Sequence, residues 1–232
     1  MTWTRQLRDA LSLADSPIGR DRPRGPATML SLAALATILL DLNRLPWRID
    51  YATAFPRIIP SLIVLAWLAI DLRGDPPALG LRWRPLPSWR FWLRAGLYVG
   101  ALFAVIVAAA MAIYFTHHGV SWPAEVPPPG DISLWHTAVH YPVVEEIIYR
   151  WALVTALVTC TSRWSAVVLS GLAFGYLHFV YGVAAPNNVA AGFVFAWVYL
   201  RSGQIALPIA LHSIGNLLVT GGNAIAYELL SC

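Results

Sequence analysis

The chain has 232 residues, of which 58% are hydrophobic and only 12% are charged. Because a soluble domain carries about 25% charged residues, this composition excludes an ordinary soluble protein and predicts a polytopic membrane domain. The formal net charge of +4 comes from basic residues that are all arginine, which we interpret as loop charges that orient membrane spans and not as a nucleic-acid site.

The amino-terminal segment, residues 1–27, is rich in arginine and contains no short apolar core followed by a small-residue cleavage site. It therefore does not fit a signal peptide. Two interpretations stay open for it. Trp3, Leu7, Ala10 and Ala14 recur at helical spacing, which favours a helix lying on the membrane surface. A solvated basic tail is the alternative.

Apolar runs along the rest of the chain predict membrane-spanning helices, because about 20 residues at 1.5 Å each cover the hydrocarbon layer. Together they predict an all-α polytopic bundle of about seven transmembrane helices, with the active site inside the bundle. This bundle forms a single domain over 28–232, with its catalytic core at 133–221. The runs cover about 28–42, 55–71, 91–116, 133–160, 164–182, 188–200 and 204–221.

Arginines alternate with tryptophans in residues 72–94, between two of these runs. Between membrane spans, this pattern is more typical of an interfacial belt whose arginines face lipid phosphates than of nucleic-acid binding. The loop 117–132 carries no Arg or Lys. The positive-inside rule therefore predicts a cytoplasmic amino terminus. The composition leans toward a bacterium, so we expect an integral protein of the bacterial plasma membrane.

Glu145, Glu146 and Arg150 lie inside an otherwise apolar segment. Ionised groups at such a depth cost roughly 2.5–3.5 kcal/mol each, so they either neutralise one another or perform chemistry. Glu146 and Arg150 have the i,i+4 spacing of an ion pair within one helix. Glu145 is then the unpaired carboxylate and the better catalytic candidate. Tyr149, one turn along, either donates to Glu145 or faces a neighbouring helix.

Two further i,i+4 pairs, Phe174 with His178 and His212 with Asn216, lie in other predicted spans. Each polar residue alone would be interpreted as forming a hydrogen bond between helices, but together they predict a shared site. A carboxylate and an imidazole can take a proton from water and direct the hydroxide at a carbonyl group. A second imidazole and a carboxamide can stabilise the oxyanion, at about 2.7–4 kcal/mol for one donor.

Zinc held by Glu145, His178 and His212 is the alternative to this metal-free chemistry. We rank it second, because the sequence contains no His-Glu-x-x-His helix and its histidines come from separate spans. A proton relay in a transporter is a third and weaker interpretation, since no matched pair of broken helices is present.

The three motifs Glu145-Glu146-x-x-x-Arg150, Phe174-x-x-x-His178 and His212-x-x-x-Asn216 resemble, in this order, the CAAX-protease and bacteriocin-processing family. This is the Abi or type II CAAX prenyl endopeptidase group of glutamic intramembrane proteases. The segments Gly80-Leu-Arg-Trp-Arg and Tyr199-Leu-Arg-Ser-Gly-Gln also look familial. The resemblance implies an intramembrane peptidase in an all-helical fold.

By the same resemblance, Glu145 and His178 are the water-activating pair, and His212 and Asn216 stabilise the oxyanion. Glu146, Arg150 and Phe174 match supporting positions of the motifs. The expected substrate is a membrane-embedded or lipid-anchored peptide or protein tail, with no required cofactor unless zinc is used. A non-enzymatic immunity protein that keeps the same pocket is the alternative from a different class.

Overall fold

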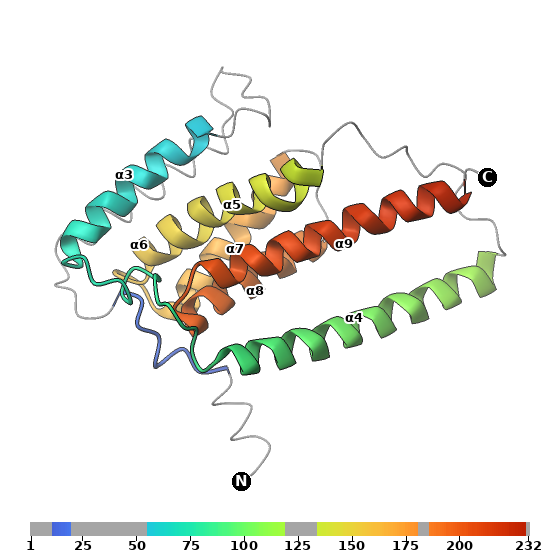
Figure 1. Cartoon of the computed structure of the whole chain (residues 1–232), viewed down its shortest axis with the longest axis horizontal. Coiled ribbons are helices and arrows are strands. Elements are labelled where there is room, and N and C mark those ends of the chain that lie inside the picture. The colour runs from blue at the N-terminus through green and yellow to red at the C-terminus, as the bar shows by residue number, and fades with distance from the viewer. Residues whose placement is uncertain (1–10, 20–54, 119–133, 181–185, 231–232) are drawn as a thin grey trace, which may run out of the picture.

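The computed structural model describes residues 11–19, 55–118, 134–180 and 186–230 (Figure 1). Within these ranges the chain is helical and forms no β-strand, apart from a single antiparallel bridge between Leu81 and Gln204. The helices are α3 (Phe55–Asp71), α4 (Trp89–His118), η2 (His136–His140), α5 (Tyr141–Glu146), η3 (Ile147–Val154), α6 (Thr155–Leu157), α7 (Arg163–Val180), α8 (Pro186–Ser202) and α9 (Ala206–Leu230).

The all-α prediction is confirmed for this part of the chain, and most predicted runs coincide with helices. The run at 55–71 matches α3, and the others match α4, α7 and α8 to within a few residues. The last helix, α9, does not end near 221 but continues to Leu230. The predicted run at 28–42 and most of both the 1–27 segment and the 117–132 loop lie outside the described residues.

The sequence predicts about seven membrane spans. Among the described residues, however, none of the helices is both long and apolar enough to cross a membrane. The predicted number of about seven transmembrane helices is likewise not confirmed.

The fourth predicted span is helical, but it is not a regular α-helix. Two π-helical stretches, η2 and η3, flank α5, and the N–H of Tyr141 bonds to the carbonyl of His136 five residues back. A π turn contains more residues than an α turn, so each residue in η2 and η3 turns the helix by less than the 100° of a regular α-helix. Neighbouring helices donate side-chain hydrogen bonds to both stretches: Asn216 Nδ2 to the Thr137 carbonyl and Ser170 Oγ to the Tyr149 carbonyl, each at 2.9 Å.

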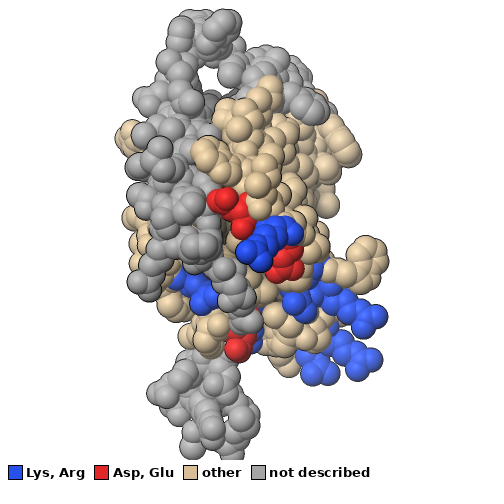
Figure 2. Space-filling view, turned by 90° about the vertical axis from the view of Figure 1, so that its left-hand side faces the viewer, with Lys and Arg blue, Asp and Glu red and all other residues tan. Residues whose placement is uncertain are grey.

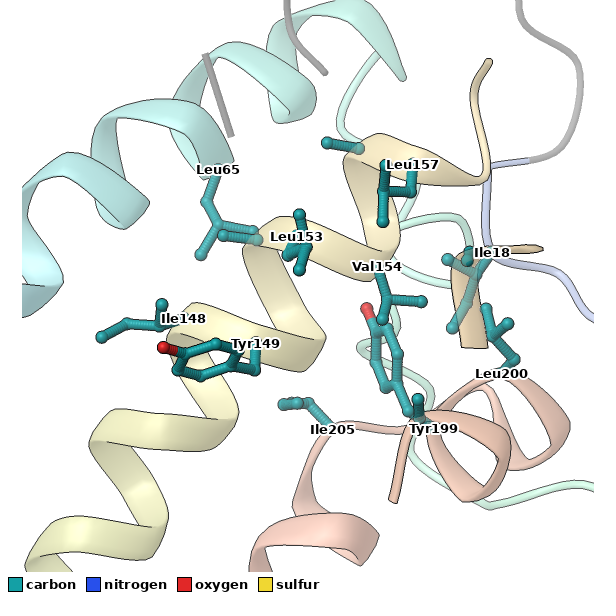
Figure 3. Packing of buried hydrophobic residues seen from close by; sticks show 14 of the residues in the cluster. Ile18, Leu65, Ile148, Tyr149, Leu153, Val154, Leu157, Tyr199, Leu200 and Ile205 are labelled. Carbon is teal, nitrogen blue, oxygen red and sulfur yellow. The ribbon is translucent and has the colours of Figure 1, made fainter. Parts of the chain in front are cut away.

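We call the continuous helical segment from η2 to α6, residues 136–157, the composite helix. The hydrophobic core surrounds it (Figure 3). Val154 of η3 is fully buried, and Tyr199 of α8 lies beside it. Residues 11–19 also contribute to the core, through Leu13 and Ile18. The described part of the amino-terminal segment therefore packs against the bundle.

Helices α7 and α8 approach each other closely because glycines line their contact. A Cβ at Gly175 would lie 2.6 Å from Val189, and one at Gly192 would lie 2.8 Å from the carbonyl oxygen of Gly171. Small residues allow this close approach between helix backbones. The packing places the carbonyl of Gly192 next to η3.

The two short segments that look familial in the sequence contact each other. Ile205 N–H donates to the Gly80 carbonyl at 2.9 Å, and Leu86 N–H donates to the Ser202 carbonyl at 2.9 Å. The buried Tyr199 hydroxyl lies 2.7 Å from Thr155 Oγ1. We call this contact between residues 79–86 and the α8–α9 turn the clasp.

The clasp is also joined to the composite helix. The Leu79 carbonyl accepts hydrogen bonds from Trp151 Nε1 at 2.8 Å and from the Tyr199 hydroxyl at 3.3 Å. Because Trp151 belongs to η3, the clasp and the helix that carries Arg150 form one packed unit.

Gly80→Ala is expected to destabilise the fold more than Gly74→Ala. Both glycines have positive φ, at +71° and +68°, so both alanines carry a similar backbone strain of about 1 kcal/mol. Only at Gly80 would the new Cβ also clash with the buried Tyr199 ring, 2.8 Å from its Cζ, whereas nothing lies within 4 Å at Gly74. Thermal unfolding should show an additional loss of about 1–3 kcal/mol for Gly80→Ala. Equal losses in the two variants would contradict the clasp.

Candidate active site

The predicted site residues come from four helical segments. Glu145 and Glu146 end α5, and Arg150 follows on η3. Phe174 and His178 lie on α7, while His212 and Asn216 lie on α9. Glu145, Glu146, Arg150 and His212 are all buried, and His178 is half-buried.

The predicted ion pair within the glutamate helix is confirmed. Arg150 Nη1 lies 3.1 Å from Glu146 Oε1, and both side chains are 0% exposed. Arg150 Nη2 also donates to the Gly192 carbonyl of α8 at 3.2 Å. Its guanidinium carbon lies 4.3 Å from the centre of the Phe174 ring and 5.3 Å from that of Phe195. These contacts replace part of the solvation that the guanidinium loses on burial.

His212 connects this ion pair to the second glutamate. Its Nδ1 lies 2.9 Å from Glu146 Oε1, and a carboxylate oxygen only accepts, so Nδ1 is the donor. On the other side, His212 Nε2 lies 3.8 Å from Glu145 Oε2, which is within ion-pair range but too long for a hydrogen bond. Glu146 therefore contacts both Arg150 and His212, whereas the sequence assigned it to Arg150 alone.

The ring of His178 has a defined orientation. Its Nδ1 lies 2.9 Å from the Phe174 carbonyl. A carbonyl can only accept, so Nδ1 carries the hydrogen and a neutral ring has its lone pair on Nε2. Among the described residues, no hydrogen bond or ion pair joins His178 to Glu145. The predicted pairing of these two residues on one water thus stays a prediction.

Asn216 and Tyr149 each have a neighbour that the sequence does not identify. Asn216 donates to the Thr137 carbonyl of η2 and leaves its second Nδ2 hydrogen for another acceptor. The fully buried Tyr149 ring packs edge-on against Phe174, with ring centres 5.6 Å apart. It therefore faces a neighbouring helix, which is one of the two roles that the sequence left open.

The zinc alternative requires Glu145, His178 and His212 to meet at one point. In the described part of the chain, no three His, Cys, Asp or Glu side chains are grouped so that they could hold one metal ion. Nδ1 of His212 is also already bonded to Glu146. This arrangement does not fit a three-ligand zinc site.

Phe195, Gly192 and Ser170 contribute to the site but were missed in the sequence. Phe195 stacks on His212, with ring centres 4.9 Å apart and planes 25° apart. Single apolar or small residues in an apolar helix carry no chemical signature. The spacing of Gly171 and Gly175 is the one signal that could have indicated close packing of α7 against a neighbour.

Comparisons with known proteins give a match to the region that contains the three motifs. Residues 132–218 match the type II CAAX prenyl endopeptidase Rce1-like family. A Bacillus subtilis protein named "Putative membrane peptidase YdiL" is 28% identical over 139 residues, which is 55% of this chain. The match spans about half of that relative, 54% of its length. No solved structure matches the chain significantly.

Arg150→Met is expected to destabilise the protein by about 3–5 kcal/mol, because it leaves Glu146 buried without its cation. Adding Glu146→Gln to Arg150→Met should recover part of this loss, since the double variant no longer buries that carboxylate charge. A double-mutant cycle from thermal unfolding measures the coupling energy between the two side chains. Arg90→Met is the exposed control, with an expected change within about 0.5 kcal/mol. An Arg150→Met loss no larger than this control would contradict the buried ion pair.

Proposed function

We propose that this chain, whose residues 132–218 match the type II CAAX prenyl endopeptidase Rce1-like family, is a membrane peptidase. The observation that carries the proposal is the buried cluster in which His212 lies between Glu145 and Glu146, with Arg150 paired to Glu146. The reaction is hydrolysis of a peptide bond near the end of a membrane-associated peptide or protein tail, by an activated water and without a covalent enzyme intermediate.

Glu145 and His178 are the proposed water-activating groups. Glu145 is the glutamate without a cationic Arg partner, and His178 presents the lone pair of Nε2, since its Nδ1–H is held by the Phe174 carbonyl. In the proposed step, one of them takes a proton from water as the water oxygen bonds to the carbonyl carbon. The proton is then delivered to the leaving nitrogen as the C–N bond breaks.

His212 and Asn216 are the proposed donors to the oxyanion. His212 Nδ1–H is bonded to Glu146, so a proton on Nε2 makes the ring an imidazolium that can donate to a developing oxygen charge. The formal charges of Glu145, Glu146, Arg150 and His212 then sum to zero. An electroneutral set is favoured in a buried site, because uncompensated charges are costly there. Asn216 adds the Nδ2 hydrogen that Thr137 does not use.

The proposed location is the bacterial plasma membrane, in contact with the lipid bilayer. Large apolar side chains are strongly exposed on the outside of the fold, including Leu97 at 65%, Leu102 at 61% and Leu218 at 69%. Surfaces of this kind mark contacts with lipid or protein. The relative's printed name, which describes a membrane peptidase, supports the same location.

Glu145→Gln, His178→Ala and His212→Ala are each expected to lower the cleavage rate by at least about 100-fold, since each removes a proton-transfer group or an oxyanion donor. The assay uses the purified protein in detergent with membrane-embedded peptides and follows cleavage by mass spectrometry. Phe179→Ala, on an exposed position beside His178, is the matched control and should cleave normally. Cleavage that survives all three substitutions would rule out the mechanism.

Chelation separates the metal-free mechanism from its zinc alternative. Dialysis against EDTA or 1,10-phenanthroline should leave the cleavage rate unchanged within about twofold, because the proposed steps use only water and protein groups. Metal content is measured in the same samples by elemental analysis. A loss of activity that zinc restores would instead support Glu145, His178 and His212 as ligands.

A further inference from the structure

We propose that the surface formed by residues 82–94 docks on anionic phospholipid headgroups and so fixes the candidate site relative to the membrane surface. This inference rests on the proposed membrane location, but not on the peptidase chemistry. We call this surface the arginine–tryptophan surface. Its exposed arginines and tryptophans are Arg84, Arg90, Arg94, Trp83 and Trp89.

Charge is the first argument. No Asp or Glu occurs between Asp75 and Glu125, so the arginines of this surface have no acidic neighbour along the chain. The α8–α9 turn, which the clasp holds beside them, contains no acidic residue. Figure 2 shows basic side chains gathered toward the lower right of the molecule. Such a cationic patch is complementary to lipid phosphates, at about 1 kcal/mol for each arginine near the surface.

The aromatic side chains make the second argument. Trp83 is 90% exposed and Trp89 is 50% exposed, and both indoles alternate with the arginines. Amphipathic indole rings prefer the level of lipid headgroups. A soluble anion would need the arginines but would gain nothing from two indoles held in solvent.

The order of polar and apolar residues makes the third argument and disfavours nucleic acid. Helix α4 starts at this surface, and after Arg94 the large side chains that it exposes are mostly apolar, including Leu97 at 65% and Leu102 at 61%. A headgroup layer followed by hydrocarbon presents the same order of polarity. A nucleic acid has no apolar layer that could cover α4.

Docking at this surface positions the candidate site because the segment is rigidly anchored. The buried Trp92 donates from Nε1 to the Leu86 carbonyl at 2.8 Å, and Leu86 N–H bonds to the Ser202 carbonyl. The clasp thus ties the surface to the start of α9 at Ala206. His212 is six residues further on, about 9 Å along the helix axis. The headgroup layer therefore sets how deep the candidate site lies.

The test compares lipids that differ only in headgroup charge. The purified protein in neutral detergent is titrated with phosphatidylglycerol or with phosphatidylcholine of the same acyl chains, and binding is measured by competition with a fluorescent lipid. We expect a clear preference for phosphatidylglycerol that weakens at high salt. The triple variant Arg84→Gln/Arg90→Gln/Arg94→Gln should lose roughly 100-fold in phosphatidylglycerol affinity and little for phosphatidylcholine.

Arg73→Gln is the matched control, because Arg73 is exposed but flanked by Asp71 and Asp75. It should change phosphatidylglycerol affinity by less than about twofold. Trp83→Ala should weaken binding of both lipids, because the indole interacts with the interface and not with the charge. If the triple variant does not fold by circular dichroism, Arg84→Gln alone should still cost about fivefold.

Equal binding of the two lipids by the unmodified protein would overturn the proposal, and so would a preference that the triple variant retains. Glycerol 3-phosphate, which carries a phosphate but no acyl chain, is the third arm. If it competes as well as the lipid does, the surface binds soluble anions and not a membrane. Because no cleavage is measured, failure here leaves the peptidase proposal untouched, and loss of cleavage in Glu145→Gln leaves this one untouched.

Discussion

Moving a carboxylate and a guanidinium from water into a protein interior costs several kcal/mol for each ion, and the Glu146–Arg150 pair meets this cost with contacts from three directions. Glu146 forms an ion pair with Arg150 and accepts a hydrogen bond from His212. The guanidinium also donates to α8 and lies over the rings of Phe174 and Phe195. The pair itself lies within one helical segment, and the contacts of its two ions with Gly192 and His212 connect that segment to α8 and α9.

The surrounding packing is adapted to this requirement. The carbonyl of Gly192 accepts from Arg150 at the place where α7 and α8 approach closely, since a Cβ at Gly192 would contact the Gly171 backbone. The π-helical stretches on either side of the glutamates receive hydrogen bonds from Ser170 and Asn216. Such stretches are frequent at functional sites, where they place side chains that a regular helix could not align.

The contacts of the two glutamates indicate different roles for them. His212 is oriented by the same carboxylate that neutralises Arg150, and the ring of Phe195 stacks on its face. Glu145 approaches the opposite ring nitrogen of His212 without a hydrogen bond. This leaves Glu145 as the glutamate least committed to structure, which is the property that the proposed hydrolysis needs from a proton acceptor.

Local residue patterns determined much of this protein from the sequence alone. Apolar runs gave the positions of α3, α4, α7, α8 and the start of α9, because helix formation depends on nearby residues. The i,i+4 spacing of Glu146 and Arg150 predicted their ion pair for the same reason. The three motifs predicted the family that residues 132–218 match.

Only the tertiary structure decided which helices share the glutamates. The bond between His212 and Glu146, the stacking of Phe195 and the clasp of Gly80 with the α8–α9 turn join residues far apart in the chain. Spacing within one helix cannot encode such contacts. The sequence also did not predict the π turns, whose carbonyls accept hydrogen bonds from other helices.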